Sequence, residues 1–283
     1  MKNSKFIVDD DYDLVKFLTS RGYAKNKVKT YVKLGFIYIN NKVIVKLPYS
    51  VSSGDIVEIK KEFVVDSKLD ILYEDDNYLI VNKKEGLLTI STGLVNREVE
   101  HTLYKEVREY LNKKKELAFI VNRIDKETSG IVIFVKNQEL KEKLQSNWNK
   151  IVKKRGYIAI VSGKIEKPGR IENYLYEDKL TFSHSTRVGG KLAITNYKPI
   201  KYNDKYTMLD INIETGRKNQ IRVHMSEMGH PIIGDKKYKC TSNPIHRLGL
   251  HHYEISFVNP CDGNIMTIKK EVPCEFNDLF SYN

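Results

Sequence analysis

Apolar residues near the start of the chain are spaced as on two short amphipathic helices. Each set follows the i, i+3, i+4 pattern of one helix face. The two sets are Leu14, Phe17 and Leu18, and then Val28, Tyr31 and Val32. The intervening Arg21-Gly22-Tyr23 is typical of a turn. This stretch therefore predicts two helices within residues 13–33.

Short strands are predicted next. The runs Phe36–Ile39 and Ile56–Ile59 are rich in aromatic and β-branched residues, which favour strands. Asn40-Asn41 follows the first run and is typical of a hairpin turn. The pattern changes near residue 66, so we predict two domains with the bounds 1–66 and 67–283.

The larger part of the chain alternates between strand-like runs and helical stripes. Strands are predicted for the runs 71–73, 79–82, 131–135, 157–161 and 208–213, and for the alternating Tyr253, Ile255 and Phe257. Helices are predicted for two stripes, Leu140, Leu144 and Trp148, and Ile221, Met225 and Met228 before Gly229. This mixture predicts an α+β fold with a mixed or antiparallel sheet.

The balance of charge narrows the range of partners. The chain of 283 residues carries a formal net charge of +12, and its isoelectric point is near 9.3. A positive field of this size attracts nucleic acid or an anionic membrane. A basic enzyme without a polyanionic partner remains the alternative.

Several classes of protein are disfavoured. No stretch approaches the roughly 20 apolar residues of a membrane span, and Met1 to Asp11 lacks the apolar core of a signal peptide. Cys240, Cys261 and Cys274 show no spacing typical of a zinc site or a disulfide framework. No glycine-rich phosphate loop or nucleophile elbow is present. We therefore expect a cytoplasmic monomer that uses no membrane, metal or nucleotide cofactor.

Lysines gather on the second predicted helix. Lys25, Lys29 and Lys33 recur every four residues, so their ammonium groups share one side of it and could face either phosphates or solvent. The order of elements over residues 13–57 resembles the S4-type RNA-binding module, although Asn40-Asn41 stands where that module usually has Asn-Gly. The resemblance implies that the first domain binds RNA.

The densest group of polar residues lies in the second domain. The run from Asn122 to Gly130 places Asp125 in a turn rich in Thr, Ser and Gly, just before the apolar run 131–135. A carboxylate in such a turn can line a pocket. From the spacing alone, however, an ordinary turn aspartate is favoured.

The stretch from Arg123 to Gly130 resembles the motif of the RluA-type pseudouridine synthases, in which Arg-Leu-Asp leads into Thr-Ser-Gly. Further stretches match that family in its own order: 74–83, 154–163, 214–224, 229–235, 247–251 and 257–260. The likeness covers nearly all of residues 69–268. It implies a pseudouridine synthase acting on RNA, with large ribosomal RNA favoured over tRNA.

The resemblance also implies a mechanism. The reaction breaks the bond between ribose carbon 1′ and uracil nitrogen 1 and rejoins the base through carbon 5, so it needs no cofactor. Asp125 is the catalytic carboxylate, either as nucleophile at the sugar or as base toward its 2′ hydrogen. Arg222 is its ion-pair partner and favours its ionised form. Tyr157 is expected to stack on the extruded uracil.

Contacts with the RNA are expected around this carboxylate. A uridine inside a helix must be flipped out before it can react. By resemblance Arg123 fills the vacated space, and Lys126, Lys154 and Arg155 hold flanking phosphates. Arg217 is a further candidate for a phosphate contact.

Other functions remain open at this point. One is a non-catalytic RNA-binding or ribosome-assembly factor with the same fold, and another is a hydrolase that pairs Asp125 with Glu127. Asn122 and Asn219 stand where the family usually has histidine. These departures indicate a diverged member with a shifted substrate or, as the less favoured alternative, reduced activity.

Overall fold

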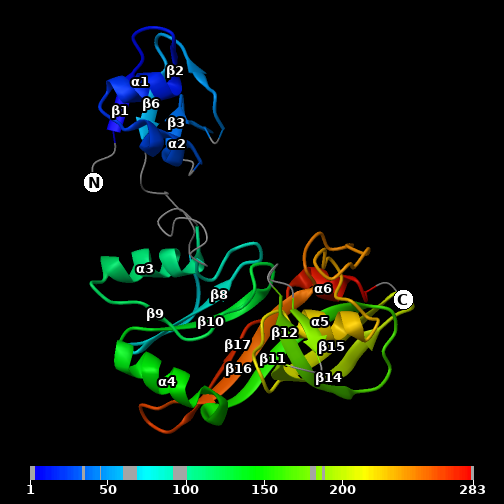
Figure 1. The fold of residues 1–283 in the computed structure, drawn as a ribbon. Coiled ribbons are helices and arrows are strands. Elements are labelled where there is room, and N and C mark those ends of the chain that lie inside the picture. Colours follow the sequence, from blue (N-terminus) through cyan, green and yellow to red (C-terminus); the bar gives the residue numbers. More distant parts are fainter. Residues whose placement is uncertain are drawn as a thin grey trace. The chain divides into compact units, whose positions relative to one another are not determined.

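The computed structural model describes residues 4–33, 36–44, 46–59, 69–91, 101–178, 183–186 and 189–281. The described residues fall into two compact units, a small one within 4–59 and a large one within 69–281 (Figure 1). The predicted domain boundary near residue 66 lies outside the described residues. No helix in the described part of the chain is long and apolar enough to cross a membrane.

The small unit packs two helices on short strands. Its four-stranded sheet has the order β1-β6-β3-β4, and β2 pairs with β5. The bounds are β1 Ser4–Ile7, β2 Tyr12–Asp13, α1 Leu14–Ser20, α2 Lys25–Lys33, β3 Ile37–Ile39, β4 Lys42–Ile44, β5 Ser50–Val51 and β6 Ile56–Ile59. Both predicted apolar stripes lie in its core, and Asp13 caps α1 by accepting from the amides of Val15 and Lys16. The two predicted helices are confirmed.

Asn40 and Asn41 form the turn between β3 and β4. Their φ angles are 47° and 66°, and Ile39 pairs with Lys42 directly across the turn. A two-residue hairpin turn needs this left-handed backbone at both positions, and asparagine adopts it more easily than most residues. The Asn-Asn pair therefore makes the turn without glycine.

The large unit is built on one mixed sheet. Its strand order is β13-β12-β14-β15-β11-β16-β10-β8-β7, with β17 beside β16 and β9 beside β10. The bounds are β7 Asp70–Glu74, β8 Tyr78–Lys83, β9 Phe119–Ile120, β10 Ser129–Val135, β11 Val152–Ser162, β12 Gly169–Glu177, β13 Ser183–Thr186, β14 Lys191–Tyr202, β15 Tyr206–Ile213, β16 Leu250–Val258 and β17 Ile265–Lys269. Strands β10 and β16 are parallel, whereas the remaining neighbours are antiparallel. The predicted α+β class with a mixed sheet is confirmed.

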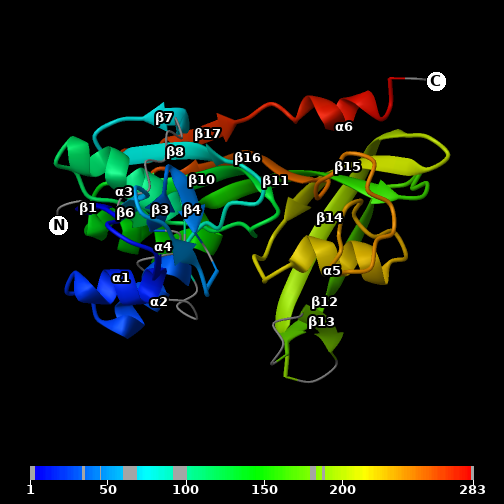
Figure 2. The same ribbon diagram turned by 90° about the horizontal axis from the view of Figure 1, so that it is seen from above.

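Helices cover both faces of this sheet (Figure 1). Their bounds are α3 Leu103–Lys113, α4 Gln138–Ile151, α5 Gln220–Glu227 and α6 Cys274–Asp278. Helices α3 and α5 pack in the apolar cluster that contains Tyr157, Ala159 and Val161 of β11. Helix α6 packs with Ile158 and Ile160 of the same strand, and α4 packs in a further cluster. Figure 2 shows α5 and α6 on opposite sides of β14 and β15.

The central strands are buried and mostly apolar because both of their faces are covered. All seven residues of β10 are buried, and so are seven consecutive residues of β11. Side chains alternate between the faces of a strand, so a strand covered on both sides needs apolar residues at every position. Strand β12, which lies beside the edge strand β13, instead alternates between half-buried and exposed positions along most of its length. The sheet therefore has an apolar centre, and the polar turn of Asp125 enters it at β10.

Candidate active site

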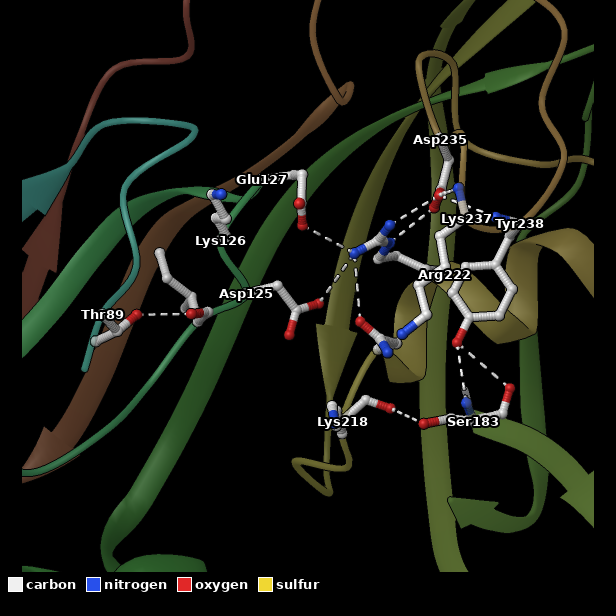
Figure 3. Close-up of polar contacts among 12 residues, drawn as sticks. Thr89, Asp125, Lys126, Glu127, Ser183, Lys218, Arg222, Asp235, Lys237 and Tyr238 are labelled. Carbon is white, nitrogen blue, oxygen red and sulfur yellow. Dashed lines mark hydrogen bonds and ion pairs between the residues drawn. The ribbon is translucent and has the colours of Figure 1, made fainter. Parts of the chain in front are cut away.

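The turn that carries Asp125 is held by hydrogen bonds on both of its sides. Thr89 Oγ1 donates to the carbonyl of Ile124 at 2.6 Å, and Lys83 Nζ donates to the carbonyl of Lys126 at 3.0 Å. Figure 3 shows the Thr89 bond and the Asp125 side chain directed toward Arg222. The backbone just before and just after the carboxylate is therefore fixed by side chains from other segments.

Lys83 is a buried support of this turn. Its side chain is inaccessible to solvent, and its Nζ also donates to the carbonyls of Lys84 and Leu87 at 2.9 and 2.7 Å. Burial lowers the pKa of Lys83 to about 8, and the negative charge of Asp125 opposes that change. The sequence marked Lys83 only as the end of a matching hairpin, and nothing in the local pattern indicated a buried ammonium.

Gly130 lets the turn pass directly into the centre of the sheet. Its φ is 122°, and a Cβ at this position would lie 2.2 Å from the carbonyl oxygen of His252. Gly130 and His252 are partners in the parallel pairing of β10 with β16. Only glycine fits this close approach of two backbones, so the Thr-Ser-Gly end of the turn has a steric cause.

Arg222 is brought to Asp125 from α5. Its Nη1 lies 3.7 Å from Asp125 Oδ2. Its Nε and Nη2 donate to both oxygens of Asp235 at 2.7 and 2.8 Å. Asp235 is fully buried and also accepts from the amides of Lys237 and Tyr238. A bidentate pair fixes the plane of a guanidinium, so Asp235 aims the third nitrogen of Arg222 at Asp125 (Figure 3).

Burial and charge act on Asp125 in opposite directions. Its side chain is 28% exposed, whereas that of Arg222 is 4% exposed. Burial raises the pKa of Asp125 above its ordinary value of 3.8, and the positive charge of Arg222 opposes this rise. The predicted effect of Arg222 therefore has the expected sign, but burial outweighs it. The environment of this carboxylate therefore favours its protonated form more than water does.

Tyr157 lies on the same face of the sheet as this site. It is 9% exposed, and its ring stacks on that of His252 with centroids 4.5 Å apart and an angle of 18° between the planes. Burial raises the pKa of Tyr157, and the negative charge of Asp125 raises it further. The hydroxyl is therefore protonated at neutral pH, and the ring is held flat by a neighbour that the sequence did not indicate.

Comparisons with known proteins agree with this geometry. A family model described as RNA pseudouridylate synthase matches residues 77–227, which is more than half of the chain and includes Asp125, Tyr157 and Arg222. The chain belongs to this family. It is thus a pseudouridine synthase, an isomerase that acts on uridine in RNA.

Relatives carry the same family name, and solved structures share the fold. The chain is 31% identical to the uncharacterized RNA pseudouridine synthase YhcT of Bacillus subtilis, over 75% of this chain and 71% of that protein. It is 28% identical to the ribosomal large subunit pseudouridine synthase D of Pasteurella multocida, over 91% and 86%. The fold matches human RNA pseudouridylate synthase domain containing 1, with a TM-score of 0.59 and 21% identity over 72% of this chain and 83% of that one.

Two basic residues predicted to hold phosphates have partners within this synthase. Lys154 pairs with Glu254 at 2.6 Å and donates to the hydroxyl of Tyr253. Tyr253 follows His252 in β16, so it faces the side of the sheet opposite to Tyr157. Arg155 is 8% exposed, and its Nη2 donates to the carbonyl of Glu214. The geometry therefore does not favour phosphate contacts by Lys154 or Arg155, because both cations are already engaged within the protein.

Other predicted RNA-binding residues lie on the surface of the large unit. Arg123, Lys126 and Arg217 are exposed, and Arg217 Nε donates to the carbonyl of Leu192 at 2.8 Å. Arg123 and Lys126 flank Asp125 in its own turn, and Figure 3 shows the side chain of Lys126 near it. Lys237 was not predicted, yet its positive charge favours the ionised form of Asp125.

In the small unit, Lys25 and Lys29 lie on α2 and are exposed. Both line a groove of about 620 Å³ together with Lys16 of α1 and the apolar Val15, Leu47 and Pro48. Lys33 is the last residue of α2, and its side chain lies outside the described part of the structure. The lysine row therefore borders a concave surface.

Asn122 and Asn219 have structural roles. Asn122 Oδ1 accepts from the amide of Ile133 in β10 at 2.7 Å. The side chain thus supplies the acceptor that a neighbouring strand would otherwise supply. Asn219 precedes α5 with a φ of 54°, and its Oδ1 accepts from Arg222 Nη1 at 3.3 Å. Asparagine tolerates this left-handed backbone. Both residues therefore support the site through hydrogen bonds that neutral amides can make.

Proposed function

We propose that this synthase converts specific uridines of large-subunit ribosomal RNA to pseudouridine, with Asp125 as the catalytic carboxylate. The observation that carries the assignment of Asp125 is its position 3.7 Å from an arginine that Asp235 holds in place. The choice of RNA is supported by relatives named as ribosomal large subunit pseudouridine synthases, which match over about nine tenths of the chain.

The chemistry requires an ionised carboxylate in either of its two routes. In one, an Asp125 oxygen attacks carbon 1′ as the bond to uracil nitrogen 1 breaks, and the rotated uracil then displaces the carboxylate through carbon 5. In the other, Asp125 removes the 2′ hydrogen as that bond breaks and returns it after the base has rejoined. In both, carbon 5 finally loses its proton and nitrogen 1 gains one, so the product is an isomer of the substrate.

Arg222 and Tyr157 support these steps. Arg222 counteracts the effect of burial on Asp125 and so favours its ionised form. Tyr157 presents a protonated, buried ring beside the carboxylate, on which a flipped uracil can stack. The flip itself costs a few kcal/mol of unstacking, which binding to the protein must offset.

RNA contacts are proposed for both units. Arg123 and Lys126 are exposed beside Asp125, so they can contact the space and the phosphates next to a flipped nucleotide. We propose that the small unit is an S4-type RNA-binding domain that uses Lys25, Lys29 and Lys33. Its order of helices and strands and the lysine-lined groove support this assignment.

The test compares ribosomal RNA from cells with and without this gene by carbodiimide-based mapping of pseudouridine. The deletion strain is complemented with wild type, with Asp125→Asn, or with Asp262→Asn as a control in an exposed turn. We expect one or a few pseudouridines to disappear on deletion and to return with wild type and the control alone. Persistence of all sites in the deletion strain would refute ribosomal RNA as the substrate. Restoration by Asp125→Asn would refute the role of Asp125.

A further inference from the structure

Two carboxylates share one nitrogen of Arg222. Nη1 lies 3.4 Å from Glu127 Oε2 and 3.7 Å from Asp125 Oδ2. The other two nitrogens, Nε and Nη2, are held by Asp235. Nη1 is therefore the nitrogen that the two carboxylates share, together with Asn219 Oδ1 at 3.3 Å, and Glu127 lies slightly closer to it than Asp125 does (Figure 3).

Glu127 differs from its neighbours in exposure. Its side chain is 52% exposed, whereas those of Asp125 and Arg222 are 28% and 4% exposed. It belongs to the same turn as Asp125, so the hydrogen bonds that fix this turn also place Glu127. A negative charge at this position draws Nη1 away from Asp125 and repels its carboxylate directly.

We propose that Glu127 is a positioning residue of the isomerisation. It competes with Asp125 for Arg222 Nη1 and so weakens the stabilisation of the ionised Asp125 by that guanidinium. This inference rests on the proposed role of Asp125. Glu127 acts through Arg222 and through its own charge, and it has no part in bond breaking or proton transfer.

Charged and titratable groups from several elements surround Asp125. They are Arg222 of α5, Asp235 and Lys237 beyond that helix, Glu127 of the same turn, Lys83 of β8 and Tyr157 of β11. Burial is the largest cause of the raised pKa of Asp125, and Glu127 is the acidic group that raises it most. Asp235 acts in the same direction but is buried and required to hold Arg222. Glu127 is therefore the acidic group whose charge can be removed without dismantling the site.

The size of the effect follows from the geometry. Because both carboxylates contact the same nitrogen, their nearest oxygens lie within about 7 Å of each other. With water-like screening, which suits a half-exposed side chain, two unit charges at this distance change an equilibrium constant about threefold. Removing the charge of Glu127 should thus increase the ionised fraction of Asp125 about threefold at acidic pH.

The first experiment measures single-turnover rates from about pH 4.5 to pH 8. The substrate is a ribosomal RNA transcript with tritium on carbon 5 of uridine, which the reaction releases. The variants are Glu127→Gln, the charge-conserving Glu127→Asp, and Glu85→Gln. Glu85 is a matched control, because it is 46% exposed and pairs with a different buried arginine, Arg247, at 3.2 Å.

We expect Glu127→Gln to reach its plateau rate at lower pH than wild type. On the acidic side its rate, relative to its own plateau, should exceed that of wild type about threefold. Glu127→Asp and Glu85→Gln should retain the wild-type profile. A purely structural role would lower the plateau of Glu127→Gln and leave the position of the acidic limb unchanged, and that result would overturn the inference.

A second measurement does not depend on turnover. Urea unfolding of wild type and of Glu127→Gln, each with and without Asp125→Asn, reports the titration of Asp125 in the folded state. The inference predicts that this titration moves to lower pH when Glu127 is neutral, and coinciding curves would overturn it. If wild type releases no tritium, the proposed substrate fails, while the unfolding series still decides the role of Glu127.

Discussion

Replacement of Arg222 by methionine tests whether the buried ion pair with Asp235 holds the active site together. The substitution removes the charge at similar volume and leaves Asp235, which is fully buried, without its cation. Breaking a buried pair by removing one partner costs about 3–5 kcal/mol. Asp235 keeps the amides of Lys237 and Tyr238, at 3.0 and 3.1 Å, which favours the lower end of that range. This cost falls on Asp235 rather than on Asp125, whose side chain is partly exposed.

Urea unfolding followed by tryptophan fluorescence measures this loss in the relevant unit. The single tryptophan of the chain, Trp148, lies in α4 of the large unit. For an unfolding slope of about 3 kcal/mol per molar urea, the midpoint of Arg222→Met should fall by about 1–2 M. The exposed Arg108 of α3 provides a control, and Arg108→Met should change the free energy of unfolding by less than about 0.5 kcal/mol.

The double variant Arg222→Met with Asp235→Asn separates the loss of the pair from the loss of packing. An asparagine oxygen can still accept from the two amides but carries no charge, so the double variant should regain most of the stability lost by Arg222→Met. A loss below about 1 kcal/mol for Arg222→Met would refute the reasoning from burial. A double variant no more stable than Arg222→Met would refute the assignment of the cost to Asp235.

Three further substitutions probe the turn of Asp125. Burial raises the pKa of Asp125, so its ionisation weakens the folded state as pH rises from 3.8 through the raised value. Asp125→Asn should therefore unfold at higher urea than wild type at pH 7, with a smaller difference near pH 4, and a lower midpoint at pH 7 would contradict this. Lys83→Met should lower the free energy of unfolding by about 2–4 kcal/mol, because three carbonyls lose their donor. Thermal melting should show this loss, whereas the control Lys84→Met, at an exposed position, should melt like wild type. Gly130→Ala should fail to give soluble protein, since its Cβ would meet the backbone of β16. In the control Gly263→Ala the added Cβ would have no atom within 4 Å, so this variant should remain folded. Equal yields of the two variants would argue against the steric requirement.

Different residues stabilise the backbone of the turn and set the charge of Asp125. Lys83 and Thr89 hold the backbone by donating to carbonyls, whereas Arg222 and Glu127 act on the charge of Asp125. Variants of the first pair should therefore change melting more than the pH dependence of turnover. Variants of Glu127 should do the reverse.

The local pattern of apolar residues was sufficient to predict elements whose burial is either strictly periodic or continuous. The stripes of α1 and α2 and the apolar run of β10 became buried as predicted. Helix α3 was missed although Leu103, Val107 and Leu111 have helical spacing and are buried. Strand β12 was missed for a physical reason. It lies near the edge of the sheet, where one face is solvated and an apolar run is not required.

The family motifs indicated Asp125, Tyr157 and Arg222 as candidate site residues from sequence, because the order of short motifs can be read where overall identity is low. They could not reveal which neighbours each of these residues has. Lys154 and Arg155 are adjacent to the Tyr157 motif, yet each is engaged by its own partner within the protein. Lys154 faces the side of the sheet opposite to Tyr157, because successive residues of a strand point to opposite faces. Arg155 shares the face of Tyr157 but is engaged by the carbonyl of Glu214.

The sequence by itself thus determined the family and the α+β class, and it indicated the carboxylate that we propose to be catalytic. The tertiary structure decided what sets the properties of that carboxylate: the Asp235 pair that aims Arg222, the buried ammonium of Lys83, His252 behind Tyr157 and the competing charge of Glu127. Apart from Glu127, these groups come from segments distant from Asp125 in the chain. Their effect depends on distance and burial, which arise only when the sheet assembles and excludes water.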